Sequence, residues 1–287
     1  PGRKDRRLVE DEFQPTAVRN LTLTLSGPLG LPKTTFLANV RRNEFDDYVR
    51  GQRIFQPVPT LYTDPEDSTQ KFLGPTLGNL EEGVLGWSRE WSGAVKLTNA
   101  SIPNSKLSYE ALFNRLESRR IQYAFLLNPD GLPEQHTWSV VHGLGLRCTL
   151  GKATFLEASF RQNYFDYFDR VYEDVFDGRY DAAGPPQRYD LNADPWETFV
   201  GGVDFTRFEQ NTNTYLFKGS VTSQLTTVQQ LKAGLELQLP EVKFGTPGHL
   251  VRTESGSTES GTELRRFFND PAHGYVAVQR YWPVLGA

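Results

Sequence analysis

Apolar and polar residues alternate along most of this chain, and a period of two is the pattern of a β-strand with one buried face. In the first such segment Leu21, Leu23 and Leu25 share one face, and Asn and Thr residues occupy the other. No apolar stripe with helical spacing has comparable length. The pattern predicts an all-β, antiparallel protein of about eight or nine strands. The predicted strands are 18–26, 34–43, 87–98, 106–114, 136–150, 154–161, 215–223, 231–239 and a partial one at 275–279.

The connections between these segments alternate between short and long. The short connections are GPLGLPK, ASIPNS, LGKA and LTTVQQ, whereas a long polar stretch covers about 45–82. A soluble sandwich has no reason to sort its loops in this way, but a transmembrane β-barrel has short periplasmic turns and longer extracellular loops. A tilted strand crosses a bilayer with about 9–11 residues, which most of the segments provide. The sequence therefore predicts transmembrane β-barrel strands.

The polar faces of the predicted strands have the composition of a wet barrel interior. They combine Gly, Ser and Thr with isolated charges, and Gly143 and Gly145 are expected to permit close approach or bending. We expect the cations either to line a path or to meet a plug, and pairing with carboxylates of the same face is the favoured alternative. The cations are Arg41, Lys96, Arg147, Arg161, Lys218 and Lys232, and the carboxylates are Glu110, Glu157 and Glu236.

Aromatic residues gather near the predicted strand ends, where a membrane barrel carries its interfacial girdles. Packing at the edge of a soluble core would give the same clustering, so the signal only supports the barrel. The groups are Phe45 with Tyr48, Trp87 with Trp91, Tyr123 with Phe125, and Tyr164, Phe165, Tyr167 and Phe168.

Composition excludes several classes of protein. With 38% hydrophobic and 13% aromatic residues the chain is too apolar to be disordered, and a net charge of −4 argues against a nucleic-acid partner. No run of 18 apolar residues is present, so a transmembrane helix is not predicted. The chain has no methionine, and its N-terminus, PGRKDRRLVEDEF, is charged rather than signal-like. These features predict an internal or processed piece of a longer protein.

Chemistry-bearing motifs are absent from the sequence. It has no GxSxG, HExxH, P-loop or GxGxxG in a strand-to-helix setting, so no catalytic residue, cofactor or enzymatic activity is predicted. The histidines His136, His142, His249 and His273 lack metal-ligand spacing, and no metal site is predicted from them. The single cysteine, Cys148, lies on an apolar face and is expected to act as a small hydrophobic residue.

An acidic and aromatic run from Tyr164 to Asp181 is the most informative loop segment. Its carboxylates could supply oxygen ligands to a hard cation such as Ca²⁺, although their spacing does not match a 12-residue calcium loop. The favoured alternative is a strand that extends above the membrane into a solvated loop. The aromatic residues could also hold a ligand in an outer vestibule. The candidate ligand or loop-ion residues are Asp166, Asp169, Glu173, Asp174 and Asp177.

Several blocks of the chain resemble the barrel of TonB-dependent outer-membrane receptors. The segment RNLTLTLSGPLG, followed by a strand and YVRGQRIF, is similar to the early barrel strands, and NTNTYLFKGSVTSQLTTVQQLKAGLELQ is similar to a membrane hairpin. The block from LNPDGLPEQHTW to DVFDGRY looks like the middle of the same barrel. The blocks occur in the expected order and cover most of residues 15–240.

The resemblance implies a location in the outer membrane of a Gram-negative-type bacterium and TonB-dependent uptake of an unidentified solute. Receptors of this family have a plug domain, a TonB box and a 22-stranded barrel. Neither plug nor box is visible here, and eight or nine strands cannot close such a barrel. Residues 1–287 are therefore interpreted as one barrel segment with long extracellular loops. The implied partners are outer-membrane lipid, the TonB complex, and remaining strands and a plug from elsewhere in the protein or from another chain.

Two other classes of function stay open at this stage. Eight strands suffice for a small complete outer-membrane barrel, which would be a pore or an enzyme. An enzyme of that kind would need a Ser/His/Asp set at its extracellular rim, and none is evident. The chain could also be a soluble all-β binding module, against which the alternation of loop lengths argues.

Overall fold

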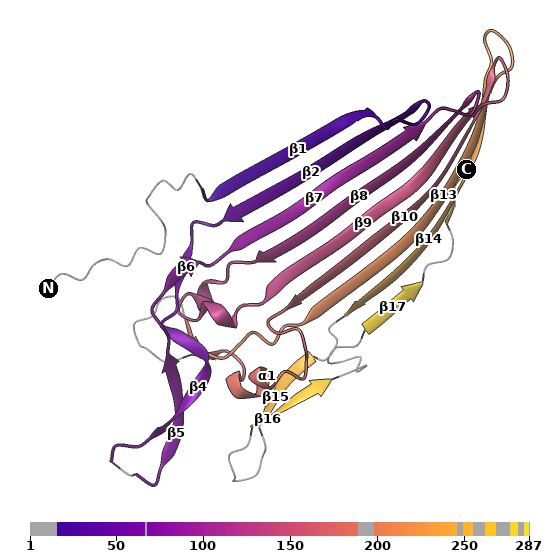
Figure 1. Cartoon of the computed structure of the whole chain (residues 1–287). Helices are drawn as coiled ribbons and strands as arrows, with labels where there is room; N and C mark the ends of the chain where they lie inside the picture. The colour runs from indigo at the N-terminus through magenta and orange to yellow at the C-terminus, as the bar shows by residue number, and fades with distance from the viewer. Residues whose placement is uncertain are drawn as a thin grey trace.

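Eight long antiparallel strands dominate the computed structural model, which describes residues 16–66, 68–188, 198–245, 249–254, 262–267, 276–280 and 284–286. They lie side by side in one curved sheet (Figure 1). Two short strands, β17 and β18, pair with β14 and complete a ten-stranded sheet. The strands are β1 (Val18–Pro28), β2 (Thr34–Asp46), β7 (Trp87–Asn99), β8 (Ser105–Arg119), β9 (Glu134–Thr149), β10 (Thr154–Arg170), β13 (Phe208–Gln224), β14 (Gln230–Gly245), β17 (Val276–Arg280) and β18 (Val284–Gly286).

The order of the sheet is β1-β2-β7-β8-β9-β10-β13-β14-β17, so each long strand pairs with the next long strand of the chain. Within the described residues β1 has β2 as its one neighbour and does not pair with β14, so the sheet is open. The predicted all-β antiparallel fold is confirmed, and the predicted long strands correspond to those observed.

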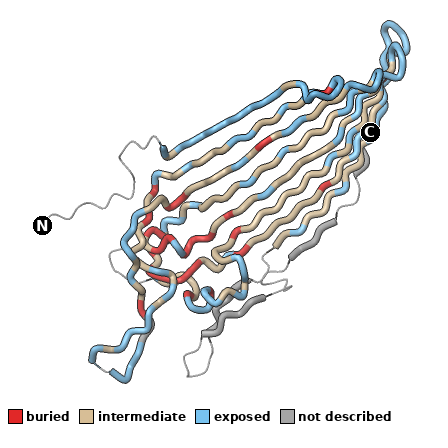
Figure 2. Tube along the Cα trace, viewed as in Figure 1, coloured by how far each residue is buried: buried red, intermediate tan, exposed pale blue. Residues whose placement is uncertain are grey.

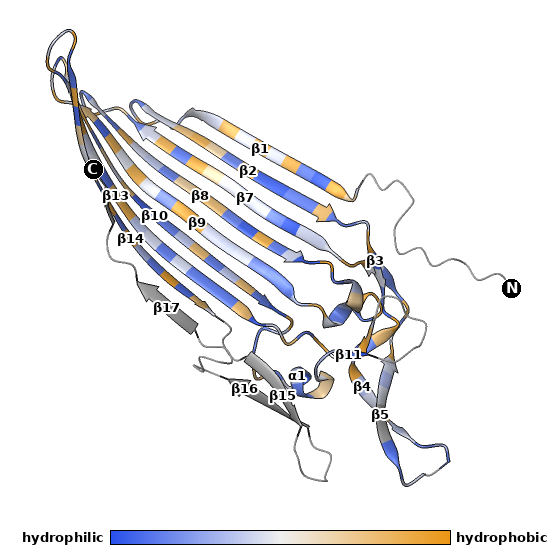
Figure 3. Cartoon of the chain, turned by 180° about the vertical axis from the view of Figure 1, so that it is seen from behind, coloured by the Kyte–Doolittle hydropathy of each residue, from blue (hydrophilic) through white to orange (hydrophobic). Residues whose placement is uncertain are grey.

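Register gives the sheet two chemically different faces. Leu25 lies opposite Ala38, which lies opposite Val95, so apolar positions continue from β1 through β2 to β7. The neighbouring positions form the polar face, where Asn39 Nδ2 donates to Thr24 Oγ1 at 2.7 Å. Figure 3 shows this alternation as successive hydrophobic and hydrophilic bands along the strands. Because side chains alternate with a period of two, direct pairing keeps each kind on its own side.

The apolar face is uncovered in the described part of the chain. Leu21 is 71% exposed and Leu235 is 59% exposed, although both lie within strands of the sheet. Figure 2 shows mostly intermediate and exposed residues along the long strands, and buried residues mainly where the loops meet the sheet. A soluble sandwich would place a second layer over such a face, because a half-apolar sheet needs one side buried.

The four short turns lie at one end of the sheet. They are residues 29–33, 100–104, 150–153 and 225–229. Lys33 and Asn104 have positive φ, 49° and 57°, as tight turns require. The Leu150 amide donates to the Thr154 carbonyl at 2.8 Å, which closes the shortest turn. The predicted alternation of short and long connections is confirmed.

The long connections are structured. Two strand pairs form within and next to the polar stretch 45–82, where no strand was predicted, and Pro57 and Pro59 interrupt the alternation of one of these strands. Elements outside the large sheet are β3 (Arg50–Gln52), β4 (Phe55–Thr63), β5 (Lys71–Leu77), β6 (Glu82–Val84), the 3₁₀ helices η1 (Tyr123–Phe125) and η2 (Pro129–Gly131), α1 (Gly178–Ala183), β11 (Gln187–Arg188), β12 (Phe199–Gly201), β15 (His249–Glu254) and β16 (Thr262–Phe267).

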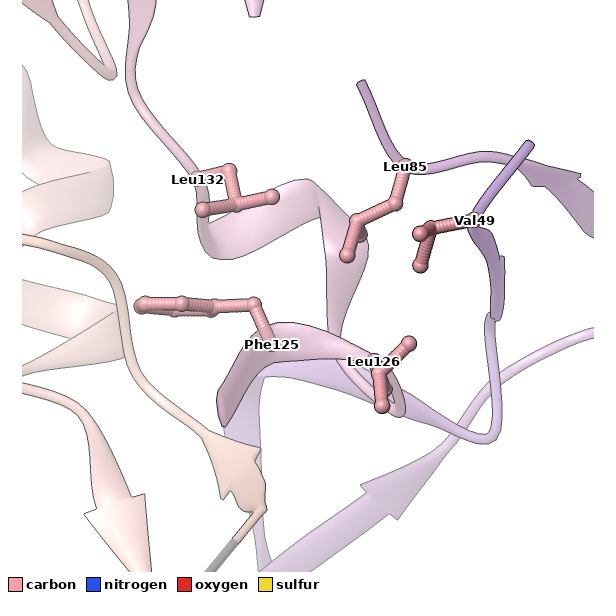
Figure 4. Close-up of a cluster of buried hydrophobic side chains, with 5 residues drawn as sticks. All are labelled: Val49, Leu85, Phe125, Leu126 and Leu132. Atoms are coloured by element: carbon pink, nitrogen blue, oxygen red, sulfur yellow. The ribbon is translucent and has the colours of Figure 1, made fainter. Parts of the chain in front are cut away.

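The loop cap is the described part of connections 47–86, 120–133 and 171–207, and it has its own hydrophobic core. Figure 4 shows this core, to which two connections contribute. Phe125 is 1% exposed and meets the ring of Phe199 edge-on at 4.7 Å. Phe125 is therefore a core residue of the cap, which corrects its assignment to an interfacial girdle. The core consists of Val49, Leu85, Phe125, Leu126 and Leu132.

A second small core stabilises connection 171–207. Tyr180, Ala183 and Val203 are buried together, with Tyr180 0% exposed. Backbone hydrogen bonds also join the connections, since the Gln52 amide donates to the Leu126 carbonyl at 2.7 Å. The cap is thus a folded layer at the end of the sheet opposite the short turns (Figure 1).

None of the helices in the described ranges is long and apolar enough to cross a membrane. Residues 1–15, which carry the charged N-terminal segment, lie outside the described residues, as do His273 and Tyr275. The last predicted strand is otherwise found as β17.

Candidate functional site

The polar face of the large sheet carries ion pairs between neighbouring strands. The predicted ion pairs are present: Lys96 Nζ lies 2.6 Å from Glu110 Oε1, and Lys218 Nζ lies 3.0 Å from Glu236 Oε2. Arg147 pairs with Glu157 at 2.5 Å. Each pair joins directly opposite positions of neighbouring strands, where cross-strand attraction is strongest.

Cations outnumber carboxylates on this face. Register places the residues on one side of the sheet, because directly opposite residues share a face. The cations are Arg41, Lys96, Lys106, Arg147, Arg161, Lys218 and Lys232, and the carboxylates are Glu90, Glu110, Glu157, Asp169 and Glu236. Lys106 is the cation of this set that the sequence analysis missed, since its place beside Arg147 depends on register.

A hollow of about 390 Å³ lies on the polar face in the half nearer the short turns. We call it the basic hollow and define it by its cations Lys96, Lys106, Arg147 and Lys218. Strands β7 and β13 both line it, although three strands lie between them and strands are about 4.8 Å apart. The hollow therefore extends across five neighbouring strands of the polar face.

Two glycines permit close approach of neighbouring atoms on the polar face. A Cβ on Gly145 would lie 2.8 Å from Ser108 Oγ, and one on Gly143 would lie 2.5 Å from the carbonyl oxygen of Phe160. Such distances are too short for a side chain without local rearrangement. The prediction that these glycines permit close approach is confirmed, and Gly145 leaves space in the wall of the basic hollow.

A band of charged and aromatic residues borders the apolar face at the end nearer the loop cap. The Arg42 guanidinium lies 5.0 Å from the ring centroid of Trp91 and 2.8 Å from Glu44. Arg115 pairs with Glu117 at 2.6 Å. Trp91 thus lies at the loop end of the apolar face, where the girdle interpretation places it.

Two predicted histidine positions have ordinary structural partners. His142 Nε2 lies 3.1 Å from Gln162 Oε1, and Gln162 Nε2 donates to Asn213 Oδ1 at 3.0 Å. His136 stacks on Phe168 at 4.6 Å. Across the described ranges, no group of three or more His, Cys, Asp or Glu side chains is placed to hold a metal ion.

Two of the acidic candidates belong to strand β10. Asp169 is 8% exposed and accepts a hydrogen bond from Gln135 Nε2 at 2.9 Å, while Arg120 approaches it at 3.6 Å. Asp166 accepts from Asn211 Nδ2 at 3.1 Å. Both carboxylates are therefore held in side-chain contacts between neighbouring strands.

The other three acidic candidates lie in the loop that follows. The Glu173 side chain is 92% exposed and lies 3.8 Å from Arg170. Asp174 Oδ1 accepts from the Phe176 amide at 2.9 Å, which forms a local turn. Asp177 caps α1 by accepting from the Arg179 amide at 2.9 Å. The five carboxylates do not form one cluster, and a role as ion ligands stays a prediction.

Asp177 has the strongest electrostatic perturbation in the cap. Hydrogen bonds from the Arg179 side chain and from its backbone amide stabilise the carboxylate, and they lower the pKa of Asp177 to about 2. The same contact raises the pKa of Arg179. The pair orders the first turn of α1 rather than presenting a free charge.

Arg207 is a buried structural residue that the sequence did not reveal. It is 3% exposed, and its guanidinium donates to the Tyr172 carbonyl at 2.8 Å and to the Glu173 carbonyl at 3.0 Å. It also donates to the Tyr180 hydroxyl at 3.0 Å. Arg207 therefore fixes two distant parts of connection 171–207 against each other.

Comparison with known proteins finds no matching family model and no matching curated protein. The structure is similar to the crystal structure of the outer membrane transporter YddB from Escherichia coli, with a TM-score of 0.54 and 11% sequence identity. The similarity covers 93% of this chain and 32% of that chain, so this chain spans about a third of the transporter's length. The described sheet has the fold of part of an outer-membrane transporter barrel.

Proposed function

We propose that this chain forms part of the wall of a transmembrane β-barrel in the outer membrane of a Gram-negative-type bacterium. The observation that carries the proposal is the uncovered apolar face on strands that end in short turns on one side and a folded cap on the other. In this arrangement the apolar face meets lipid and the polar face lines the interior. The short turns are then periplasmic and the loop cap is extracellular.

The energetics of the apolar face favour lipid as its neighbour. Transferring a side chain such as Leu21 or Leu235 out of water gains about 1.5–3 kcal/mol when burial is complete. The face repeats such positions on every long strand. Polar residues then return in the charged and aromatic band, as at a membrane interface.

The open edge of the sheet implies further strands. Each unpaired backbone group in hydrocarbon costs several kcal/mol, so a membrane-embedded β1 needs a partner along its free edge. The absence of a β1–β14 pairing among the described residues disfavours a small closed barrel. We propose that the remaining strands, and a plug within the barrel, come from another part of the protein or from another chain.

Uptake is the activity that this architecture supports best. The family resemblance supports TonB-dependent transport of a solute, in which the cap captures the solute and the inner-membrane proton gradient, relayed by TonB, opens the path. The wall contributes binding and passage rather than catalysis. Residues 1–287 act as one barrel segment in this proposal.

Cysteine labelling tests the assignment of the two faces. In a Cys148→Ser background, Leu235→Cys reports on the apolar face and Gln238→Cys on the polar face of the same strand. We expect an aqueous maleimide to label Gln238→Cys and a bilayer-restricted spin label to quench a fluorophore on Leu235→Cys. Heat-modifiable migration in detergent should accompany this result. A product that is freely soluble and monomeric without detergent would contradict the membrane assignment.

TonB dependence needs its own experiment. Membranes that contain the intact protein are incubated with the purified periplasmic domain of TonB and then washed. Retention of that domain, and its loss from membranes lacking the protein, supports the proposal. Equal retention of the TonB domain by both membrane samples would contradict TonB dependence. It would not affect the assignment as a barrel segment.

A further inference from the structure

We propose that the basic hollow binds a small anionic solute with at least two negatively charged oxygens, such as a phosphate ester or a polycarboxylate. The inference rests on the proposed function, because it treats the polar face as the wall of a transport path. It adds a class of solute that neither the fold nor the similarity specifies.

The first support is that two positively charged residues occupy directly opposite positions on neighbouring strands. Lys106 on β8 lies directly opposite Arg147 on β9, and both point from the polar face. Like charges in directly opposite positions repel, and this raises the cost of the pairing. Arg147 is neutralised by Glu157, whereas Lys106 has no ion-pair partner in the described ranges. An oxyanion bound in the hollow would neutralise Lys106 and relieve the repulsion.

The second support is the set of uncharged donors around the cations. The hydroxyls of Ser159 and Ser220 line the same hollow from two different strands, and Ser108, which also lines it, donates to the Gly145 carbonyl oxygen at 3.4 Å. A hydroxyl donates readily to a charged oxygen, and such charge-assisted hydrogen bonds are stronger than neutral ones. Glu157 is the one carboxylate in the lining. The lining therefore offers an anion many donors and little repulsion.

The carboxylates near the hollow do not neutralise all of its cations. Lys96 and Lys218 each hold one glutamate, but their side chains remain 48% and 60% exposed. Exposed ion pairs contribute little to stability, so these cations can turn toward an incoming oxyanion at small cost. The hollow thus has one unneutralised cation and further cations that can share their charge.

The size of the hollow indicates a small molecule. Its volume of about 390 Å³ falls within the range of about 300–1,000 Å³ that is usual for small-molecule sites. Gly145 contributes to this space, because a side chain there would meet Ser108.

Calorimetric titration of the intact protein in detergent, at low ionic strength, tests the site with pyrophosphate and with citrate as probes. We expect binding that weakens about fivefold or more in Lys106→Gln and further in Lys106→Glu, since each removes attraction at the site. Lys232→Gln is the matched control, because Lys232 lies on the same face but does not line the hollow. Binding to this variant should equal that of the unchanged protein.

The outcomes separate the site from the proposed function. Equal weakening in the Lys106 and Lys232 variants would indicate a general attraction of anions and overturn the site. Binding that is unaffected by Lys106→Glu would do the same. Preferential binding of an acidic peptide over pyrophosphate would replace the small solute by a polypeptide occupant. Intact heat-modifiable migration without anion binding would contradict only the proposed anion site. A protein that is soluble without detergent would contradict the proposed barrel function itself.

Discussion

Asn128 and Gly202 join two loops of the cap that lie 74 residues apart: Asn128 Nδ2 donates to the Gly202 carbonyl oxygen at 2.9 Å in a buried setting. Asn128 is 0% exposed, so water cannot replace this bond. Gly131 lies close by, and a Cβ there would come within 2.6 Å of the same carbonyl oxygen. The contact therefore holds connection 120–133 against connection 171–207 at a point with no free space.

Replacing Asn128 tests how far the cap depends on this contact. We expect Asn128→Ala to destabilise the cap by about 1–3 kcal/mol, because a buried carbonyl loses its donor. Hydrogen exchange should show faster exchange in 120–133 and 198–207, with no change in the long strands. Gln122→Ala is the control, since that exposed side chain makes no capping bond. Equal exchange in both variants would contradict the role of Asn128.

Arg207 should be the most sensitive residue of connection 171–207. Arg207→Met removes donors from two backbone carbonyls and a hydroxyl, and we expect a loss of about 2–4 kcal/mol in local stability. Limited proteolysis within 171–207 measures the effect. Arg179→Met removes an exposed guanidinium from the same connection and should change cleavage much less. Comparable cleavage of the two variants would show that burial of Arg207 is not decisive.

The start of α1 should respond to acid in a defined window. The pKa of Asp177 is about 2 in the folded protein and about 3.8 without its partners, so the carboxylate favours the folded loop at higher pH. Its contribution is complete above about pH 4 and is lost as the pH falls toward 2. Carboxyl chemical shifts of Asp177 should titrate near 2, and Arg179→Gln should move that value upward. A titration near 4 in the unchanged protein would contradict the assignment.

Two glycines of the large sheet should differ sharply in their tolerance of a side chain. Gly143→Val places a Cβ against the Phe160 carbonyl and should disturb the β9–β10 pairing, whereas nothing lies within 4 Å of the corresponding atom at Gly219. We expect a much smaller heat-modifiable fraction for Gly143→Val and an almost unchanged one for Gly219→Val. A loss of the same size in both would indicate a general intolerance of valine.

The strands were predictable because their signal is local. Alternation along β9 or β14 is evident without knowledge of the partner strand, and it placed Glu110, Glu157 and Glu236 on the same face as Lys96, Arg147 and Lys218. The opposition of Lys106 and Arg147 was hidden, because it depends on the exact register between β8 and β9. Register is set by turns and by the whole face, so it does not follow from either strand alone.

The cap escaped prediction for a different reason. Its core combines single residues of two connections, Val49 and Leu85 from 47–86 and Phe125 from 120–133, and such a core leaves no periodic pattern. Pro57 interrupts the one strand there that could have been recognised. The structural roles of Asn128 and Arg207 were also not predictable from the sequence, because burial of a polar side chain in a loop depends on contacts with distant residues.

The meandering order of the sheet also determines the sequence of folding events. Each of the four short turns closes a hairpin from adjacent segments, and short loops cost little chain entropy to close. The bond between Asn128 and Gly202 spans 74 residues and needs β9, β10 and the start of β13 to be aligned beforehand. We therefore expect the hairpins to form early and the cap to close late, so that protection of the cap amides would measure complete assembly.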